Sequence, residues 1–508
     1  MSLSVFLLWL VIIPFSVCSA SAPKGYFINC GSSGSQTVGN LSYIGDDSFI
    51  STGSQFSFNK SDLVPILNTL RYFPDESARK FCYVVPVIKG AKYLVKTTYY
   101  YGGFDGGKEP PVFDQIIGGT KWSLVNTTED YANGMSSYYE IIVAASGKTL
   151  SVCLARNAQT ASSPFISSLE VELLDDSVYN STDFEKYALS TVARNFFGGD
   201  GAMISFPDDP YNRLWQPFKD QNPVVVGRSN VTPSDFWNNP PVKAFGNAIT
   251  TSRGKTLQIQ WLLFTLPATK YYIALYFQDN RASSPYSWRV FSVSVNGKSF
   301  YNSLNVTTSG VTVSGVWPLS GQVQITLTPD ANSPVGPVIN AGEILQLIPL
   351  GGRTVTRDVM VMEELVRSFN NTPLDWIGDP CRPVENSWTG VSCSNDNFAR
   401  VISLNLTNVG LTGSLPSIIN RLTALHHLWL SGNQLSGSIP DMGLLSKLET
   451  LHLENNQFTG PIPNSLGNLV NLREIFLQNN NLDGPIPEAL QERSGINIQV
   501  SPGNHLSA

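Results

Sequence analysis

Four leucine-rich segments of nearly equal length follow one another near the carboxyl end, between Val401 and Pro487. The second leucine of each segment falls at positions 406, 430, 453 and 477. The steps are therefore 24, 23 and 24 residues, within the period of leucine-rich repeats. One such unit is too small to bury its own apolar face, so neighbouring units must stack and share a core. The repeat predicts a curved solenoid of parallel strands.

Within each copy the leucines alternate with other residues, so leucines point into the core and the residues between them point outward. An asparagine follows the strand in three copies, as Asn433, Asn456 and Asn480. There a short amide can hydrogen-bond to the turning backbone of its own coil and of the next. The first copy has Val409 in this position, with Asn408 beside it, which indicates an atypical terminal coil.

The outward side chains predict a concave face with an unusual central column. From one copy to the next, the column consists of Asn405, Trp429, His452 and Phe476. Three exposed rings in one column are uncommon, and large exposed apolar groups tend to mark contact surfaces. This face is therefore the candidate ligand-binding site, and the alternative is that the rings pack on one another or on a neighbouring domain. Its predicted members are His427, Trp429, His452, Glu454, Phe476 and Gln478.

The amino terminus predicts export. Leu3 to Val17 is a short apolar run followed by Ala20-Ser-Ala22, which is typical of a secretory signal peptide, although no Lys or Arg precedes it. Eight Asn-x-Ser/Thr sequons agree with a secreted chain. The predicted glycosylation sites are Asn40, Asn59, Asn126, Asn180, Asn230, Asn305, Asn370 and Asn405. No later stretch has the roughly 18 apolar residues of a spanning helix, so we expect a secreted or cell-surface protein, or part of a longer anchored form.

Composition and motifs argue against several function classes. There are 33 basic and 39 acidic residues and no basic run, so nucleic acid is not an expected partner. No phosphate-cradling loop, Gly-x-Ser-x-Gly or His-Glu-x-x-His motif occurs. His427 and His452 are two outward imidazoles without a third ligand, which is too few for a zinc site. Acidic pairs such as Asp46-Asp47 and Asp208-Asp209 are typical of solvated turns. We expect no enzyme activity, cofactor or metal.

The amino-terminal part, from Ala22 to about Leu350, consists of short alternating apolar runs between clusters of Gly, Pro, Asn and Asp. Such runs without helical periodicity predict a β-sandwich or jelly roll. The clearest strands are expected at 92–100, 138–143, 257–261, 271–277, 290–295 and 323–328. Val295-Asn-Gly-Lys298 predicts a hairpin turn. Residues 170–174 and 342–347 have the pattern of equivalent last strands, so two lobes are expected with a boundary near 175–182.

A cap is expected between the lobes and the repeats. Residues 356–369 carry their apolar side chains on one helical stripe, and this helix should cover the open end of the stack. Cys381 and Cys393 follow closely, and in an exported protein they predict a disulfide. The remaining lobe cysteines are Cys30, Cys82 and Cys153. They allow one disulfide plus a buried thiol, or three buried thiols.

Several motifs resemble the plant malectin-like domain family in content and order. The motifs are Ile28-Asn-Cys-Gly31, Tyr101-Gly-Gly-Phe-Asp-Gly106, Pro164-Phe-Ile-Ser-Ser-Leu-Glu170, Asp208-Asp-Pro-Tyr-Asn-Arg-Leu-Trp215 and Asn340-Ala-Gly-Glu-Ile344. The trailing Leu-x-Gly-x-Ile-Pro of the repeats resembles plant leucine-rich repeats, and the segment from Trp376 to Cys393 resembles the cap that precedes them in plant receptors. Within it, Gly378-Asp-Pro-Cys381 resembles the motif between the malectin-like and repeat regions of symbiosis-type receptor kinases. The resemblance implies a mainly β fold: two tandem malectin-like β-sandwich (jelly-roll) lobes, then a short repeat solenoid with a helical, disulfide-bonded cap.

The implied domains follow the chain. They are a signal peptide (1–22), lobe one (23–178), lobe two (179–350), the cap (351–396), four repeats (397–490) and a polar tail (491–508).

The resemblance to receptor ectodomains implies non-enzymatic recognition outside the cell. The expected partners are a cell-surface receptor or receptor-kinase ectodomain, a peptide, or wall carbohydrate. The related animal lectin domain binds a glucose disaccharide through aromatic and acidic side chains, so Tyr101, Phe104 and Asp105 are candidate carbohydrate contacts, although Tyr-rich strands are ordinarily core. The rival hypothesis is a cell-wall lectin in which the repeats are only a spacer.

Overall fold

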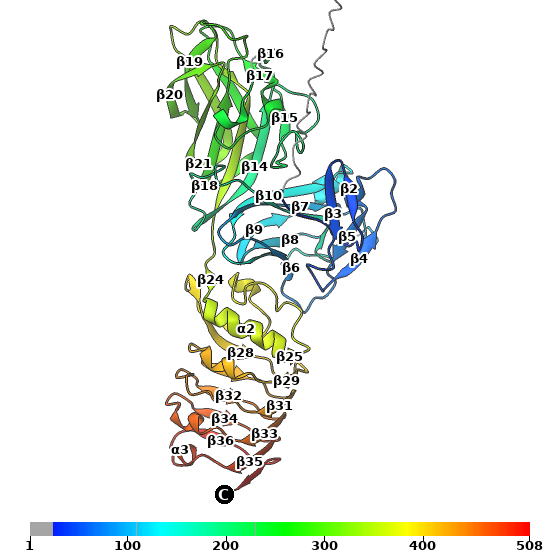
Figure 1. Ribbon diagram of the computed structural model, residues 1–508, viewed down its shortest axis with the longest axis vertical. Coiled ribbons are helices and arrows are strands. Elements are labelled where there is room, and N and C mark those ends of the chain that lie inside the picture. Colours follow the sequence, from blue (N-terminus) through cyan, green and yellow to red (C-terminus); the bar gives the residue numbers. More distant parts are fainter. Residues whose placement is uncertain (1–23, 108, 229, 508) are drawn as a thin grey trace, which may run out of the picture.

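The computed structural model describes residues 24–107, 109–228 and 230–507, and these form an elongated molecule. Two β lobes occupy one end and the repeats the other, with helix α2 (Thr356–Ser368) between them (Figure 1). The first lobe lies beside the long axis, whereas the second lobe and the repeats lie along it. The predicted signal peptide lies outside the described residues. Among those residues, no helix has the length and apolar character needed to cross a membrane.

One 13-stranded sheet runs through both lobes, in the order β2-β3-β1-β13-β7-β10-β14-β23-β18-β21-β19-β20, with β15 beside β14. The lobes join where β10 pairs with β14 antiparallel, through Ile141–Ser190 and Ile142–Leu189. The lobes are thus sandwiches, as predicted, that share a continuous backbone ladder. The strands are β1 (Gly25–Asn29), β2 (Gln36–Val38), β3 (Leu41–Gly45), β7 (Lys92–Tyr99), β10 (Ser137–Ala144), β13 (Ser168–Leu173), β14 (Tyr187–Phe197), β15 (Gln216–Phe218), β18 (Leu257–Phe277), β19 (Trp288–Val295), β20 (Lys298–Thr307), β21 (Val311–Pro329) and β23 (Ala341–Pro349).

Smaller sheets complete the sandwiches. In the first lobe, apolar residues of the long sheet pack with those of a four-stranded sheet, and a three-stranded sheet lies nearby. These strands are β6 (Phe81–Pro86), β11 (Thr149–Arg156), β8 (Phe113–Ile117), β9 (Thr120–Val125), then β12 (Phe165–Ile166), β5 (Thr69–Tyr72) and β4 (Ser54–Ser57). In the second lobe a three-stranded sheet closes the core; it consists of β16 (Val224–Val226), β17 (Asn247–Thr250) and β22 (Val338–Ile339).

The predicted strands are present, with one difference in their limits. The runs expected separately at 257–261 and 271–277 both belong to β18, which continues through register shifts around Leu266. The predicted hairpin is confirmed, because Val295 pairs with Lys298. Asn296 has φ 49° and Gly297 has φ 73°, the positive values that a two-residue turn between twisted strands requires.

The lobe cysteines form one disulfide and leave one buried thiol. Cys82 of β6 and Cys153 of β11 are directly opposite in the antiparallel pair and are bonded. Cys30 is free and fully buried, and burial raises the pKa of its thiol well above the usual value. A thiol that stays protonated in a core behaves as a small apolar group.

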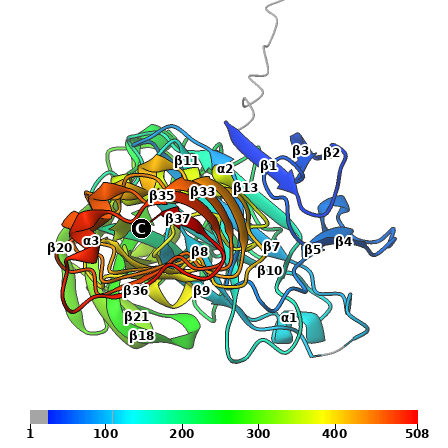
Figure 2. The same ribbon diagram turned by 90° about the horizontal axis from the view of Figure 1, so that it is seen from below.

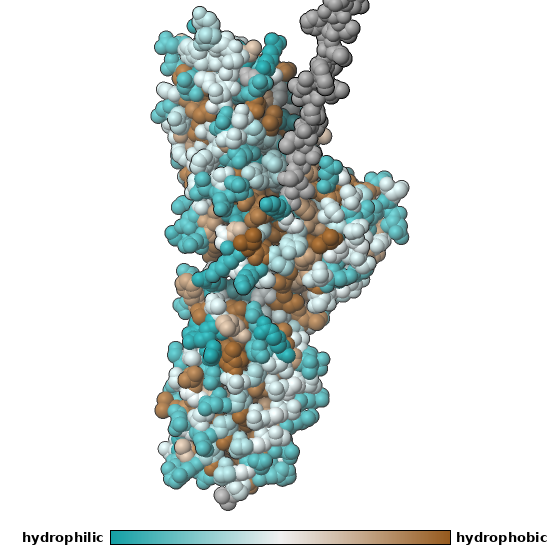
Figure 3. All heavy atoms as spheres, viewed as in Figure 1, coloured by the Kyte–Doolittle hydropathy of each residue, from teal (hydrophilic) through white to brown (hydrophobic). Residues whose placement is uncertain are grey.

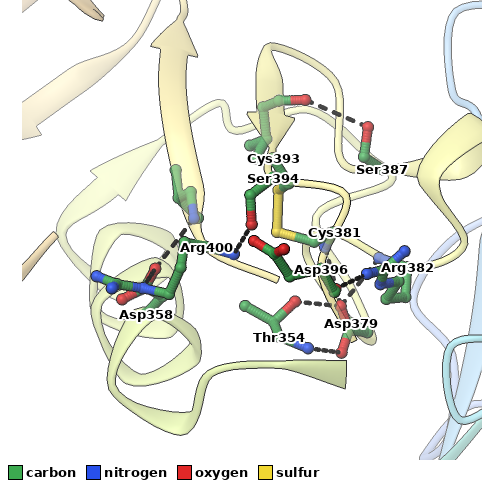
Figure 4. Close-up of a disulfide and its surroundings, with 12 residues drawn as sticks. Thr354, Asp358, Asp379, Cys381, Arg382, Ser387, Cys393, Ser394, Asp396 and Arg400 are labelled. Carbon is green, nitrogen blue, oxygen red and sulfur yellow. Dashed lines mark hydrogen bonds and ion pairs between the residues drawn. A yellow bond between two sulfur atoms is a disulfide. The ribbon is translucent and has the colours of Figure 1, made fainter. Parts of the chain in front are cut away.

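Helix α2 covers the end of the repeat stack, as predicted. Its buried side chains include Val361, Met362 and Leu365, and they join the core of the repeats. Asp358 is also buried on this face, where its carboxylate accepts hydrogen bonds from Arg400 Nε (2.9 Å) and Val401 N (3.0 Å) (Figure 4). The helix is therefore anchored by an ion pair as well as by apolar packing.

The predicted Cys381–Cys393 disulfide is confirmed, and the turn before it attaches the first lobe to the cap. Asp379 Oδ1 accepts from the amides of Cys381 and Arg382, and Asp379 Oδ2 accepts from Thr354 N at 3.0 Å (Figure 4). Lys80 of the first lobe donates Nζ to the carbonyls of Asp379 (2.7 Å) and Arg382 (3.1 Å). Burial lowers the pKa of Lys80 to about 8.

The repeats form two sheets, one on each side of the shared leucine core, and their strands are parallel except for the first strand of each sheet, which pairs antiparallel. Viewed along the long axis, successive coils lie over one another as nested arcs (Figure 2). We call the first the concave sheet: β26 (Val391–Cys393), β28 (Val401–Asn405), β30 (His427–Trp429), β32 (Thr450–His452), β34 (Glu474–Phe476) and β36 (Asn497–Gln499). The second consists of β25 (Phe369–Asn370), β29 (Thr412–Ser414), β31 (Gln434–Ser438), β33 (Gln457–Pro461), β35 (Asn481–Pro485) and β37 (His505–Ser507).

The tail expected at 491–508 is instead a fifth coil, so the prediction of four repeats and a polar tail is wrong. β36 pairs with β34, and β37 pairs with β35, both parallel. Asn504 takes the place of the repeat asparagines and donates Nδ2 to the carbonyls of Leu477 and Val500, both at 2.8 Å. Ile498 and Val500 occupy the leucine positions of this coil, and Val500 follows Leu477 by 23 residues, one further repeat step. Because these residues are not leucines, the leucine pattern alone does not reveal the fifth coil.

Candidate functional site

The predicted central column forms a continuous line of side chains across the concave sheet. Parallel register places its members next to one another in successive strands. We call this line the concave column: Asn405, Trp429, His452, Phe476 and Gln499. Neighbouring strands lie about 4.7–4.9 Å apart, so side chains at equal register contact each other.

The three rings of the concave column stack on one another. Trp429 and His452 lie 5.7 Å apart between ring centroids at 24°, and His452 and Phe476 lie 4.4 Å apart at 20°. Trp429 also donates Nε1 to Thr450 Oγ1 at 2.7 Å, which fixes the indole against the next strand. The ring packing considered as an alternative is therefore present, yet all three rings remain half-exposed on the surface of the sheet. The column is a rigid apolar ridge that partners can reach.

Hydrogen-bond acceptors flank this ridge. Glu474 Oε2 lies 3.3 Å from His452 Nε2, and Gln478 donates Nε2 to Gln499 Oε1 at 3.3 Å. Glu454 Oε2 and Gln478 Oε1 are buried acceptors without a hydrogen-bond partner among the described residues. Unpaired buried acceptors are costly, and because both oxygens are covered, a donor from outside reaches them only if these side chains turn outward.

The six concave-face residues predicted from the sequence are thus brought together on one surface. All of them are half-buried: His427, Trp429, His452, Glu454, Phe476 and Gln478. At the edge of the face, His426 Nδ1 lies 2.8 Å from Glu449 Oε1, and this hydrogen bond lowers the pKa of the Glu449 carboxyl. In the described chain, no group of three or more His, Cys, Asp or Glu is placed to hold a metal ion.

The two aromatic candidate carbohydrate contacts of the first lobe are buried, which corrects that expectation for Tyr101 and Phe104, whereas Asp105 is half-buried. Tyr101 is 1% exposed and Phe104 is 8% exposed, and their rings pack edge to face in the core. Tyr101 donates its hydroxyl to Asp105 Oδ1 at 2.5 Å, and Ser162 donates to Asp105 Oδ2. The rings therefore present no flat face to a sugar, and both oxygens of the carboxylate are engaged within the lobe.

Buried ion pairs hold the two lobes together. The guanidinium of Arg194 (β14) contacts Glu140 of the first lobe and Glu343 Oε1 of the second (2.7 Å), and all three side chains are fully buried. Asp209, expected in a solvated turn, is also fully buried and accepts from Arg213 Nε at 2.9 Å and Trp215 Nε1 at 2.6 Å. The Asp208–Trp215 motif thus supplies part of the lobe core and is not a surface site.

A second buried cluster contains Lys96, Glu170 and Glu172. Lys96 Nζ lies 2.8 Å from Glu170 Oε2 and 3.8 Å from Glu172 Oε1. Asn212 donates Nδ2 to both carboxyls. One ammonium cannot neutralise two buried carboxylates, and burial together with the neighbouring Glu170 charge raises the pKa of Glu172 well above its usual value.

A pH-dependent stability follows from Glu172. Because its folded pKa is raised, the folded state holds a proton that the unfolded chain releases, so this stabilisation is complete below about pH 4.5 and is lost as pH rises through the folded pKa. We expect Glu172→Gln to remove this pH dependence of the free energy of unfolding. The dependence amounts to about 1.4 kcal/mol per pH unit over the range in which the folded protein keeps the proton and the unfolded chain has lost it. Urea unfolding from pH 5 to 7 (~2 units) measures it. The exposed Glu76→Gln is the control, and equal slopes in wild type and Glu172→Gln would contradict the assignment.

All eight sequon asparagines are exposed, as glycan attachment requires: Asn40, Asn59, Asn126, Asn180, Asn230, Asn305, Asn370 and Asn405. Asn405 differs from the others because it belongs to the concave column. Whether each site carries a glycan stays a prediction.

Family models match most of the chain. The malectin-like domain model matches residues 28–347, and the leucine-rich-repeat model matches 424–443, 447–469 and 471–492. Two Arabidopsis thaliana relatives are the Probable LRR receptor-like serine/threonine-protein kinase At1g67720 and the Receptor-like protein kinase At3g21340. The first is 30% identical over 91% of this chain and 51% of its own length, the second 31% identical over 80% and 46%. The chain spans about half the length of these relatives.

Solved structures agree on the fold of the lobes. The Arabidopsis ANX2 ectodomain aligns with a TM-score of 0.54 at 14% identity, covering 64% of this chain and 97% of that one. The receptor-like kinase FER, in a structure titled as a complex of plant peptide RALF23 with FER and LLG2, aligns with a TM-score of 0.52 at 18% identity, covering 64% and 96%. At these identities the likeness establishes the fold alone.

Proposed function

The chain belongs to the malectin-like domain family and carries leucine-rich repeats as receptor ectodomains of that family do, and from this we propose that it is an extracellular recognition module. It binds the ectodomain of a partner receptor, or a peptide together with one, and carries out no chemistry itself. The lobes provide a stiff support, and the concave sheet is the docking surface.

The concave column carries this proposal. It combines a stacked ridge of three rings, held in place by the sheet register, with the half-buried side chains of Glu454 and Gln478, each of which has one buried oxygen without a donor. Rigid aromatic groups beside hydrogen-bonding side chains are typical of the centres of protein interfaces. On the face shown in Figure 3, hydrophobic and hydrophilic residues are interspersed over the repeats.

Two further observations favour a protein partner over a wall carbohydrate. Both aromatic sugar contacts expected in the first lobe, Tyr101 and Phe104, are buried, so the lectin hypothesis loses the rings on which a sugar would pack. FER shares the lobe fold, and its structure is that of a complex with the plant peptide RALF23 and with LLG2. This supports a peptide or protein partner here as well. Five coils form a short arc, which suits docking of another ectodomain better than enclosure of a long peptide.

Replacement of Phe476 by serine tests the proposal. The ring forms the end of the exposed ridge next to Gln499 and stacks on His452, so its loss should weaken binding to a partner ectodomain roughly thirtyfold, as expected for a hot-spot aromatic residue. Purified wild-type and Phe476→Ser chains are compared on an array of Arabidopsis receptor-kinase ectodomains and on a wall-glycan array. Val470→Ser is the matched control, because Val470 is 79% exposed but lies outside the concave sheet. Circular dichroism and thermal unfolding confirm that each variant is folded.

The two arrays separate the hypotheses. Ectodomain signals that are lost with Phe476→Ser and kept with Val470→Ser support the proposal. Glycan signals without any ectodomain signal would support the wall-lectin alternative instead.

A further inference from the structure

We propose that an N-glycan on Asn405 lies on the amino-terminal end of the concave column, with its first sugar against the indole of Trp429, so that partners dock on the later coils. The attachment of the glycan to Asn405 and its stacking on Trp429 do not depend on the function proposed above. Only the conclusion that partners dock on the later coils rests on that proposed function.

Strand register places the acceptor beside the ring. Asn405 is the last residue of β28 and pairs with Trp429 of β30, so both side chains point outward from the concave sheet at neighbouring positions. Asn405 is exposed, and Thr407 completes its sequon. The backbone of Asn405 is therefore one strand spacing, about 4.8 Å, from the backbone of Trp429, and a glycan on Asn405 starts beside the indole.

The stack leaves the β28 side of the indole without a ring in register. His452 covers Trp429 on the side of β32, at 5.7 Å and 24°, and His427 of the same strand lies beside the indole at 5.5 Å and 39°. On the side of β28 the residue in register is Asn405, which brings no ring of its own. The C–H face of a sugar packs well on a flat aromatic face, so the first N-acetylglucosamine extends the stack by one member.

This occupation divides the concave face into two parts. The first two coils, with Asn405 and Trp429, carry the glycan. The later coils keep Phe476, the half-buried side chains of Glu454 and Gln478, and Gln499 free of the glycan. No Lys or Arg occurs at the outward positions of β28, β30, β32, β34 and β36, so a partner that brings basic or amide donors meets acceptors without repulsion.

Residue-level oxidation of the intact glycoprotein tests the inference without any partner. Hydroxyl-radical footprinting with peptide mass spectrometry reports the accessibility of Trp429 and Phe476 separately, and the same spectra report glycan occupancy at Asn405. We expect Trp429 to oxidise several-fold faster in Asn405→Gln than in wild type, with Phe476 unchanged. Asn370→Gln is the control, because it removes a sequon on the other sheet, in β25, and should leave both rates unchanged.

A second pair of variants guards against misfolding. Thr407→Val abolishes the sequon and keeps Asn405, whereas Thr407→Ser preserves the sequon. The first should expose Trp429 as Asn405→Gln does, and the second should match wild type. An unmodified Asn405, or equal Trp429 oxidation with and without the glycan, would overturn the inference. Either outcome leaves the Phe476→Ser test of partner binding untouched, so the two proposals can fail separately.

Discussion

Replacing Arg194 by methionine is expected to lower the free energy of unfolding of the lobes by about 3–5 kcal/mol, because the change leaves two buried carboxylates unpaired. Glu140 and Glu343 are fully buried and converge on this one guanidinium from different lobes. Denaturant unfolding followed by circular dichroism measures the loss. The control is Lys219→Met, which breaks the exposed pair of Lys219 with Asp200 and should cost at most about 1 kcal/mol.

A second variant separates charge burial from packing. If Glu140 and Glu343 are changed to glutamine together with Arg194→Met, the unpaired charges disappear, and part of the lost stability should return. A single Arg194→Met variant within about 1 kcal/mol of wild type would show that the ion pairs do not join the lobes.

Replacing Asn456 by alanine is expected to cost about 3 kcal/mol in the repeats, because several buried backbone groups lose their partners at once. Its Nδ2 donates to the carbonyls of Leu430 (2.9 Å) and Leu453 (3.1 Å), and its Oδ1 accepts from Leu435 N (3.0 Å). One side chain therefore ties three segments of two coils. Chemical unfolding measures the loss, with the exposed neighbour Gln457→Ala as control. Equal stability of the two variants would show that the asparagine ladder is dispensable.

The repeats were the part of the fold that sequence reasoning could predict best, for a physical reason. Their contacts are local in sequence, so the leucine period and the recurring asparagine are enough to predict the stacked coils. The same reasoning missed the fifth coil, because Ile498 and Val500 replace leucine there. Asn504, which repeats the hydrogen bonds of Asn456 and Asn480, was the signal that could have revealed it.

The lobes were predictable in class but not in detail. Alternating runs indicate strands, yet alternation alone does not show which face of a strand is covered. Tyr101 and Phe104 were therefore plausible carbohydrate contacts from the sequence, although the structure buries both. Buried ion pairs were hidden for another reason: Arg194 and Glu343 are 149 residues apart, and only the folded sheet brings them together. Asp209 was hidden for a different reason: its partners Arg213 and Trp215 are close in sequence, but the sequence does not show that this segment is buried.

The central claim is that the concave column holds a partner ectodomain, and one binding measurement tests it most directly. Wild type, Phe476→Ser and Val470→Ser are titrated against each receptor-kinase ectodomain that the wild type binds on the array. The account predicts that Phe476→Ser loses affinity by roughly thirtyfold while Val470→Ser keeps the wild-type value. Equal affinities for all three chains, or binding that the two lobes without the repeats reproduce in full, would contradict it.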